Sequence, residues 1–124
     1  MADRILLVDD DPMMRTLATR MLAALGYACE TATDGGAAAA RLGEEGGGFR
    51  AVITDLMMPG TPGSKLLAFL EERFPQMPVV IATGDVVAAD RLSRPQRGRA
   101  VVVKPFRLDE LQAGLSEALG EGAP

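Results

Sequence analysis

The sequence contains no histidine and no tryptophan, and it has a single cysteine, Cys29. Without histidine there can be no Ser-His-Asp or Cys-His catalysis, no histidine-ligated metal site and no phosphohistidine carrier. One cysteine cannot form a disulfide within the chain, so nothing favours secretion. No apolar run approaches the roughly 20 residues of a membrane span, and the first residues are polar, unlike a signal peptide. We therefore expect a cytoplasmic protein, with no membrane partner, that uses carboxylates, hydroxyls, lysine or arginine.

An excess of basic charge is also missing. The 124 residues carry a formal net charge of -4. Binding to nucleic acid through bulk charge needs an excess of Lys and Arg, so we expect no direct nucleic-acid partner. The composition, with 48% hydrophobic and 24% charged residues, is ordinary for a globular chain. The length predicts a single domain over residues 1–124.

What is present is an alternation of apolar runs and helical patterns. Continuous apolar runs are typical of strands buried on both faces of a parallel sheet, and apolar residues at helical spacing indicate amphipathic helices. The predicted strands are residues 4–8, 27–32, 51–54, 79–83 and 100–103. The predicted helices are residues 12–25, 36–45, 65–74, 85–93 and 108–119. Asp11 is placed to cap the first helix and Ser64 the third.

This order of strands and helices predicts an α/β fold with a doubly wound, five-stranded parallel sheet and helices on both faces. In such folds ligands bind outside the carboxyl ends of the strands. Four of the five predicted strands deliver polar side chains to that edge. These are Asp9 and Asp10 after the first strand, Asp55 at the end of the third, Thr83 at the end of the fourth and Lys104 after the fifth.

Three carboxylates at one edge repel one another. A pair about 4 Å apart costs on the order of 4 kcal/mol at an effective dielectric constant of about 20, so the cluster needs protonation, a cation, or both. Lys104 supplies one positive charge, and Mg²⁺ suits a small site with carboxylate oxygens. With Asp9 and Asp10 on the metal ion, Asp55 is free to attack phosphorus and form an aspartyl phosphate. Mg²⁺, Lys104 and the Thr83 hydroxyl then match the three oxygens of a transferred phosphoryl group.

The sequence resembles the response-regulator receiver domains of two-component signalling. The resemblance rests on four motifs in order: ILLVDDDP at 5–12, VITDLMMPG at 52–60, VVIATGD at 79–85 and VVVKPF at 101–106. It covers essentially the whole chain and implies a flavodoxin-like fold with strand order 2-1-3-4-5. It also implies a single receiver domain that is not a conventional enzyme. Such a domain is a phosphorylation-dependent switch that catalyses only its own phosphotransfer and dephosphorylation.

The resemblance implies a role for each candidate residue. Asp55 would be the phosphoacceptor, and Thr83 and Lys104 would contact its phosphoryl group. Mg²⁺ would bind four groups: Asp9, Asp10, Asp55 and the backbone carbonyl of Met57. The Lys104–Pro105 peptide bond would be cis. Because this chain has no histidine, the phosphoryl group would come from a partner histidine kinase or histidine phosphotransfer protein.

Two positions depart from the family pattern. Val101 stands three residues before Lys104, where relatives usually carry an aromatic switch residue. Met57, two residues after the acceptor, cannot hydrogen-bond a hydrolytic water, which leaves Asp85 as the candidate for that role. We therefore expect slow to intermediate self-dephosphorylation of Asp55.

Basic residues without any acid occupy the stretch between positions 91 and 107. They are Arg91, Arg94, Arg97, Arg99, Lys104 and Arg107. One interpretation is a solvated face, which is what charge runs usually are. The other is a basic docking surface that attracts an acidic partner. The resemblance implies that the fourth helix, fifth strand and fifth helix form the output face, through which a homodimer can also form.

Other functions compete with this hypothesis. Haloacid-dehalogenase phosphatases need a second aspartate two residues after the nucleophile, where Met57 stands. The stretch GTPGSK at 60–65 lacks the GK[ST] ending of a P-loop, and no GxGxxG follows the first strand. A phosphorylation-independent interaction module on the same fold stays open. Val101 favours it, while the complete set of candidate pocket residues argues against it. The sequence also leaves open whether the domain acts alone or within a larger protein.

Overall fold

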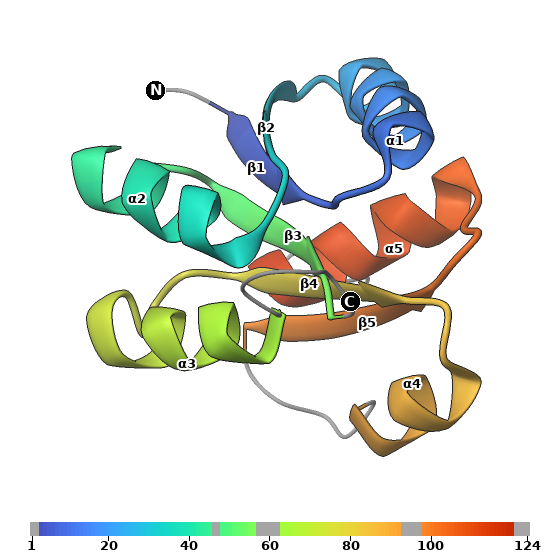
Figure 1. Ribbon diagram of the computed structural model, residues 1–124. Coiled ribbons are helices and arrows are strands. Elements are labelled where there is room, and N and C mark those ends of the chain that lie inside the picture. Colours follow the sequence, from blue (N-terminus) through green and yellow to red (C-terminus); the bar gives the residue numbers. More distant parts are fainter. Residues whose placement is uncertain (1–2, 46–47, 57–62, 93–97, 121–124) are drawn as a thin grey trace.

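The computed structural model describes residues 3–45, 48–56, 63–92 and 98–120, in which strands and helices alternate (Figure 1). The strands are β1 (Arg4–Val8), β2 (Ala28–Ala32), β3 (Ala51–Asp55), β4 (Val79–Thr83) and β5 (Arg99–Val103). The helices are α1 (Pro12–Ala24), α2 (Gly35–Glu45), α3 (Gly63–Arg73), α4 (Val86–Leu92) and α5 (Leu108–Leu119). Across the described segments these helices are too short or too polar to act as a transmembrane span.

The strands form one parallel sheet in the order β2-β1-β3-β4-β5. This confirms the predicted doubly wound α/β fold with strand order 2-1-3-4-5. The order reverses at β1, because β2 lies on one side of it and β3 on the other. The crevice between the carboxyl ends of β1 and β3 is therefore the switch point of the topology. Asp9 follows β1 and Asp55 ends β3, so both belong to this crevice.

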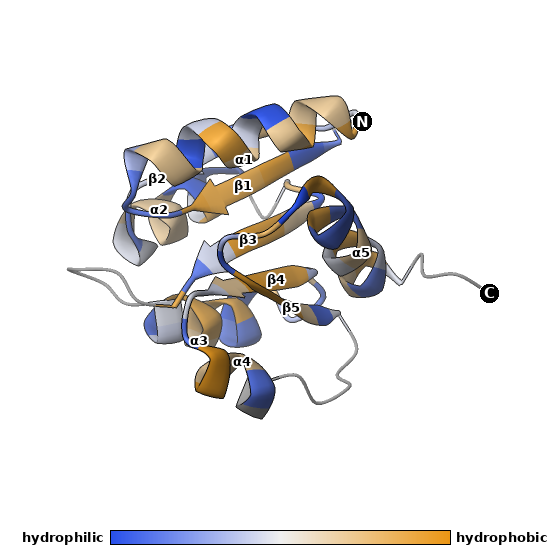
Figure 2. Cartoon of the chain, turned by 90° about the vertical axis from the view of Figure 1, so that its right-hand side faces the viewer, coloured by the Kyte–Doolittle hydropathy of each residue, from blue (hydrophilic) through white to orange (hydrophobic). Residues whose placement is uncertain are grey.

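Alternate side chains of each strand enter two hydrophobic cores, one on each face of the sheet. Ile5 and Leu7 pack with residues of α1 and α5, whereas Leu6 and Val8 pack with residues of α2 and α3. All five positions of β3 and of β4 are buried, which explains their continuous apolar sequences. Figure 2 shows that the central strands are hydrophobic. The helices carry both hydrophobic and hydrophilic residues, as expected of helices with one buried side.

Local signals fix the helix starts on either side of the crevice. Asp11 caps α1 as predicted: its carboxylate accepts a hydrogen bond from the Met13 N–H at 2.9 Å, and Pro12 occupies the first helical turn. The expectation that Ser64 caps α3 is wrong, because the helix already begins at Gly63. Ser64 lies inside its first turn.

Candidate functional site

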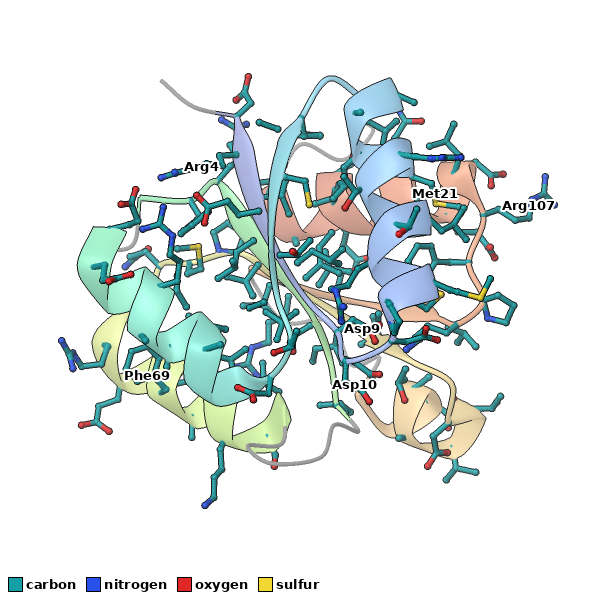
Figure 3. All side chains as sticks on the ribbon, turned by 45° about the horizontal axis from the view of Figure 1, so that its top comes forward. Arg4, Asp9, Asp10, Met21, Phe69 and Arg107 are labelled. Carbon is teal, nitrogen blue, oxygen red and sulfur yellow. The ribbon has the colours of Figure 1, made fainter. Side chains whose placement is uncertain are left out.

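The polar residues predicted at the carboxyl edge of the sheet do lie together there. Asp9 follows β1, Asp55 ends β3, Thr83 ends β4 and Lys104 follows β5. Figure 3 shows Asp9 and Asp10 next to one another at this end of the sheet. The exposed fractions of Asp9, Asp55 and Thr83 are only 4%, 7% and 0%, whereas Asp10 is exposed. The site is therefore a pocket with buried walls and one acidic residue at its mouth.

Lys104 bridges the two buried carboxylates of this pocket. Its Nζ donates to Asp55 Oδ2 at 2.8 Å and to Asp9 Oδ2 at 3.0 Å. Burial lowers the pKa of Lys104, but the hydrogen bonds to Asp55 and Asp9 outweigh burial and hold this pKa above its ordinary value. Lys104 is therefore a fixed positive charge at neutral pH. The Lys104–Pro105 peptide bond is cis, as the resemblance implied.

Asp9, Asp10 and Asp55 form an acidic cluster that fits a metal ion. One carboxylate oxygen of each lies within 4.8 Å of the others. Three carboxylates against the Lys104 ammonium leave two negative charges uncompensated, which a divalent cation would balance. Carboxylate oxygens are also the donors that hard cations such as Mg²⁺ prefer. The fourth expected ligand, the backbone carbonyl of Met57, lies outside the described residues.

Contacts that the sequence did not reveal hold Asp9 in place. The Asp11 N–H donates to Asp9 Oδ1 at 2.9 Å, and the Arg15 guanidinium donates to the Asp9 carbonyl at 2.9 Å. The Asp9 N–H donates to the carbonyl of Ala32 at 3.1 Å. With one carboxylate oxygen on a backbone N–H and the other on Lys104, the Asp9 side chain has a single orientation. Nothing in the sequence marks Arg15, because an arginine on the first turns of a helix normally faces solvent.

Gly63 lies directly against the backbone at the end of β3. Its N–H donates to the carbonyl of Leu56 at 3.1 Å. A Cβ at this position would overlap the carbonyl oxygen of Asp55 and lie 2.7 Å from the Leu56 Cα. Only glycine therefore lets α3 begin directly against the backbone of Asp55. The glycine that follows the predicted acceptor loop is the sequence signal that could have identified this contact.

Thr83 is tied to α4 through Asp85. The Thr83 carbonyl accepts the Lys104 N–H at 2.8 Å, and Thr83 Oγ1 accepts the Asp85 N–H at 3.1 Å. The Asp85 carboxylate accepts the N–H groups of Val87 and Ala88 at 3.0 and 3.1 Å, so it caps α4. Both hydrogen bonds end on Oδ1, so the oxygen Oδ1 of Asp85 serves the helix cap.

The basic stretch is partly used within the chain. Arg99 pairs with Glu71 of α3 at 2.5 Å, and Lys104 belongs to the acidic pocket. Arg107 is exposed, with its Nε 3.6 Å from Asp109 Oδ1. Three further members fall outside the described residues, either wholly or in their side chains: Arg91, Arg94 and Arg97. The docking-surface interpretation therefore depends on these three and Arg107.

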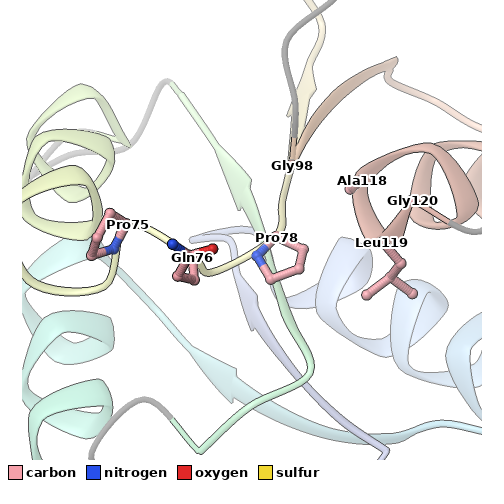
Figure 4. A pocket seen from close by; sticks show the side chains of 7 residues that line it. All are labelled: Pro75, Gln76, Pro78, Gly98, Ala118, Leu119 and Gly120. Atoms are coloured by element: carbon pink, nitrogen blue, oxygen red, sulfur yellow. The ribbon is translucent and has the colours of Figure 1, made fainter.

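A hollow of about 760 Å³ lies at the other edge of the sheet, before the starts of β4 and β5 (Figure 4). It is lined by Pro75, Gln76, Pro78, Gly98, Ala118, Leu119 and Gly120. None of these side chains is ionisable or nucleophilic, so this hollow offers no chemistry comparable to that of the acidic pocket.

A doubly wound sheet whose carboxyl edge combines an acidic cluster, a buried threonine and a lysine defines the receiver class of signalling domains. Residues 5–116 match the family model of the response regulator receiver domain. The chain belongs to this family.

The curated relatives are longer proteins. The transcriptional regulatory protein TcrA of Mycobacterium tuberculosis is 37% identical over 122 residues, which are 98% of this chain and 47% of TcrA. The transcriptional regulatory protein GlrR of Escherichia coli is 34% identical over 121 residues, which are 97% of this chain and 27% of GlrR. The chain thus spans half or less of the length of these regulators.

A solved structure shares both the fold and part of the sequence. The response regulator TrrA from Thermotoga maritima, in complex with Mg(2+)-BeF, aligns with a TM-score of 0.82 and 30% identity. The alignment covers 96% of this chain and all of that one (100%). The likeness therefore extends across the sheet and all the helices that surround the pocket.

Proposed function

We propose that residues 1–124 form a single phosphoacceptor receiver domain that takes a phosphoryl group onto Asp55. The donor would be a phosphohistidine of a partner histidine kinase or histidine phosphotransfer protein, because this chain has no histidine. One observation carries the proposal: the buried Asp55 carboxylate lies 2.8 Å from the Lys104 ammonium, in one cluster with Asp9 and Asp10. A carboxylate beside an ammonium group, in a cluster that can also hold a divalent cation, is what a phosphoryl acceptor requires.

The transfer begins when a carboxylate oxygen of Asp55 attacks phosphorus. A P–O bond forms while the P–N bond of the phosphohistidine breaks, and its electron pair returns to the imidazole nitrogen. The Lys104 ammonium then donates to one phosphoryl oxygen and the Thr83 hydroxyl donates to another. Mg²⁺, held by Asp9, Asp10, Asp55 and the Met57 carbonyl, would neutralise negative charge on the phosphoryl oxygens. Attack of water on phosphorus later breaks the P–O bond to Asp55 and releases inorganic phosphate, which restores the free carboxylate. The domain therefore catalyses only its own phosphorylation and dephosphorylation.

Mg²⁺ is the metal we assign to this cluster. The donor set is all oxygen, and the similar protein TrrA was solved as a complex with Mg(2+)-BeF. Beryllium fluoride bound to a carboxylate imitates a phosphoryl group, so that complex is consistent with an acceptor aspartate beside Mg²⁺. We place the reaction in the cytoplasm, where a kinase domain would meet this chain.

The output face would be formed by α4, β5 and α5. Apolar side chains are exposed there: Val86 at 68%, Val87 at 65% and Val103 at 41%. Apolar groups exposed on a helix and an adjacent edge strand suit a protein contact. A target protein or a second copy of this chain, forming a homodimer, would bind this face after phosphorylation.

Labelling with a small phosphodonor tests the proposal. The protein is incubated with acetyl phosphate and Mg²⁺, and its intact mass is measured. We expect one phosphoryl group that hydroxylamine removes, as it does from an acyl phosphate, and no label in Asp55→Asn or after chelation of Mg²⁺. Asp90→Asn, which removes an exposed carboxylate on α4, should be labelled like the wild type.

Two outcomes would refute phosphorylation at Asp55. One is a folded wild-type protein that stays unlabelled, and the other is an Asp55→Asn variant that is labelled as fully as the wild type. The first outcome would favour the alternative function, a receiver-fold module that binds partners without phosphorylation.

A further inference from the structure

We propose that Asp85 is a positioning residue that couples the Thr83 hydroxyl to the start of α4. This inference rests on the proposed function, because it concerns what happens to Thr83 when Asp55 carries a phosphoryl group. It gives Asp85 no contact with that group. Asp85 acts through Thr83 on one side and through the backbone of α4 on the other.

The backbone of Thr83 is fixed, and only its side chain can turn. Thr83 pairs with Val103 in the β4–β5 ladder, and its carbonyl accepts the Lys104 N–H at 2.8 Å. Its side chain is fully buried. A hydroxyl that moves from its present position to an oxygen of the phosphoryl group must therefore rotate about the Cα–Cβ bond.

That rotation breaks one specific hydrogen bond. Thr83 Oγ1 accepts the Asp85 N–H at 3.1 Å, and it cannot keep this contact while it turns toward Asp55. The N–H of Asp85 is then left without its partner. Asp85 is exposed to solvent, so its backbone can shift to find water, whereas the buried Thr83 backbone cannot follow.

The same residue holds the first turn of α4. The Asp85 carboxylate accepts the N–H groups of Val87 and Ala88, and its carbonyl accepts the Ala89 N–H at 2.9 Å. Of the α4 side chains that the structure describes, Ala89 is buried and Val87 is among the exposed ones. A short helix with so little buried surface depends strongly on its cap. A shift of Asp85 therefore moves the start of α4.

This link offers a route to α4 that needs no aromatic ring. Val101 is a short aliphatic residue that packs, partly buried, against the core beneath α2 and α3. It cannot alternate between a buried and an exposed position as a large ring can. The contacts of Asp85 connect the pocket to α4 directly, within five residues of Thr83.

NMR amide exchange in the full chain, with and without Mg²⁺ and beryllium fluoride, tests this coupling. When this phosphoryl mimic binds, we expect the Asp85 amide to exchange about tenfold faster, as for the loss of one hydrogen bond. The Val87 and Ala88 amide signals should shift at the same time. In Thr83→Val, which lacks Oγ1, the Asp85 amide should exchange fast from the outset and respond little to the mimic. A cap with a purely structural role would show no response to the mimic.

Variants at Asp85 separate the cap from the backbone N–H. Asp85→Ala keeps the N–H and removes the cap, so the α4 amides should lose their response to the mimic. Asp85→Asn, whose side-chain oxygen can still cap the helix, should restore it. Asp90→Ala removes an equal charge from the exposed side of α4 and should respond like the wild type.

Fluorine NMR of bound beryllium fluoride reports the pocket separately. A bound signal together with an unchanged Asp85 amide would overturn the coupling and leave the proposed function intact. A wild-type response of the α4 amides in Asp85→Ala would also overturn it. A wild-type protein with no bound signal would refute the proposed function, and the coupling with it.

Discussion

Replacing Lys104 with methionine removes the ammonium that bridges Asp9 and Asp55 and keeps a side chain of similar length. The two hydrogen bonds of 2.8 and 3.0 Å are lost. The buried carboxylates then face one another and Asp10 without a cation. We expect the variant to be less stable than the wild type in the absence of Mg²⁺.

The magnitude follows from the burial of the three groups. Breaking a buried ion pair by removing one partner costs about 3–5 kcal/mol. The side chain of Lys104 is 17% exposed, against 8% for Asp55 and 5% for Asp9. Because water reaches the ammonium, we expect the lower end, about 3 kcal/mol. Two carboxylate oxygens that lie no more than 4.8 Å apart repel by at least about 3.5 kcal/mol at an effective dielectric constant of about 20, which is the same size.

Urea unfolding with and without Mg²⁺ measures this effect. A cation that binds only the folded state stabilises it by mass action, and the more acidic pocket of Lys104→Met should gain more from Mg²⁺ than the wild type does. Lys65→Met, which replaces the other lysine at an exposed site on α3, should change stability by less than about 0.5 kcal/mol. A Lys104→Met variant with the wild-type urea midpoint and the wild-type Mg²⁺ response would refute the electrostatic account of the pocket.

The pH dependence has a defined sign. The pKa of Lys104 is higher in the folded state than its ordinary value of 10.5. Its stabilising effect is therefore complete below pH 10.5 and is lost as the pH rises through the folded-state pKa. The difference in stability between wild type and Lys104→Met should shrink in that alkaline range and stay constant near neutral pH.

Three further changes should have measurable effects. Gly63→Ala should lower the free energy of unfolding, measured by thermal unfolding, by about 1–3 kcal/mol and slow the labelling of Asp55, because the added methyl group displaces the acceptor backbone. An unchanged stability and an unchanged labelling rate would contradict the close contact. Asp11→Ala should cost about 1 kcal/mol in urea unfolding through loss of the α1 cap. Hydrogen bonds from Arg41 hold the pKa of Glu30 below 4.5, so Arg41→Met should lose stability above pH 4.5 and approach the wild type as the pH falls below it.

The pocket could be predicted from the sequence because its geometry is topological. Parallel strands end at one edge, so residues that directly follow or end a strand meet there whatever the details of packing. This is why the sequence alone predicts that Asp9, Asp55, Thr83 and Lys104 lie at one edge of the sheet. The apolar runs located the strands to within one residue. For example, β5 starts at Arg99, one residue earlier than expected, because its pairing with Val79 extends the ladder.

The supporting contacts could not be predicted, because they depend on how loops and helices approach the strands. The hydrogen bond from Arg15 to the Asp9 carbonyl can be predicted only if the angle between α1 and β1 is known. The role of Gly63 can be predicted only if the distance between α3 and the backbone of Asp55 is known. The spacing of Asp85 from Thr83 predicts a contact with water, and the cap that its Oδ1 makes on α4 is visible only in the structure. An aspartate at a strand-to-helix junction can serve either purpose, and only the local backbone decides.

The central claim is that Asp55 itself accepts the phosphoryl group. Reduction of the labelled protein with borohydride converts an aspartyl phosphate into homoserine, which tandem mass spectrometry locates in the sequence. We predict homoserine at position 55 alone, and only in samples that received both the phosphodonor and Mg²⁺. Homoserine at another aspartate, such as Asp9 or Asp10, or none in a folded and fully labelled protein, would contradict the account.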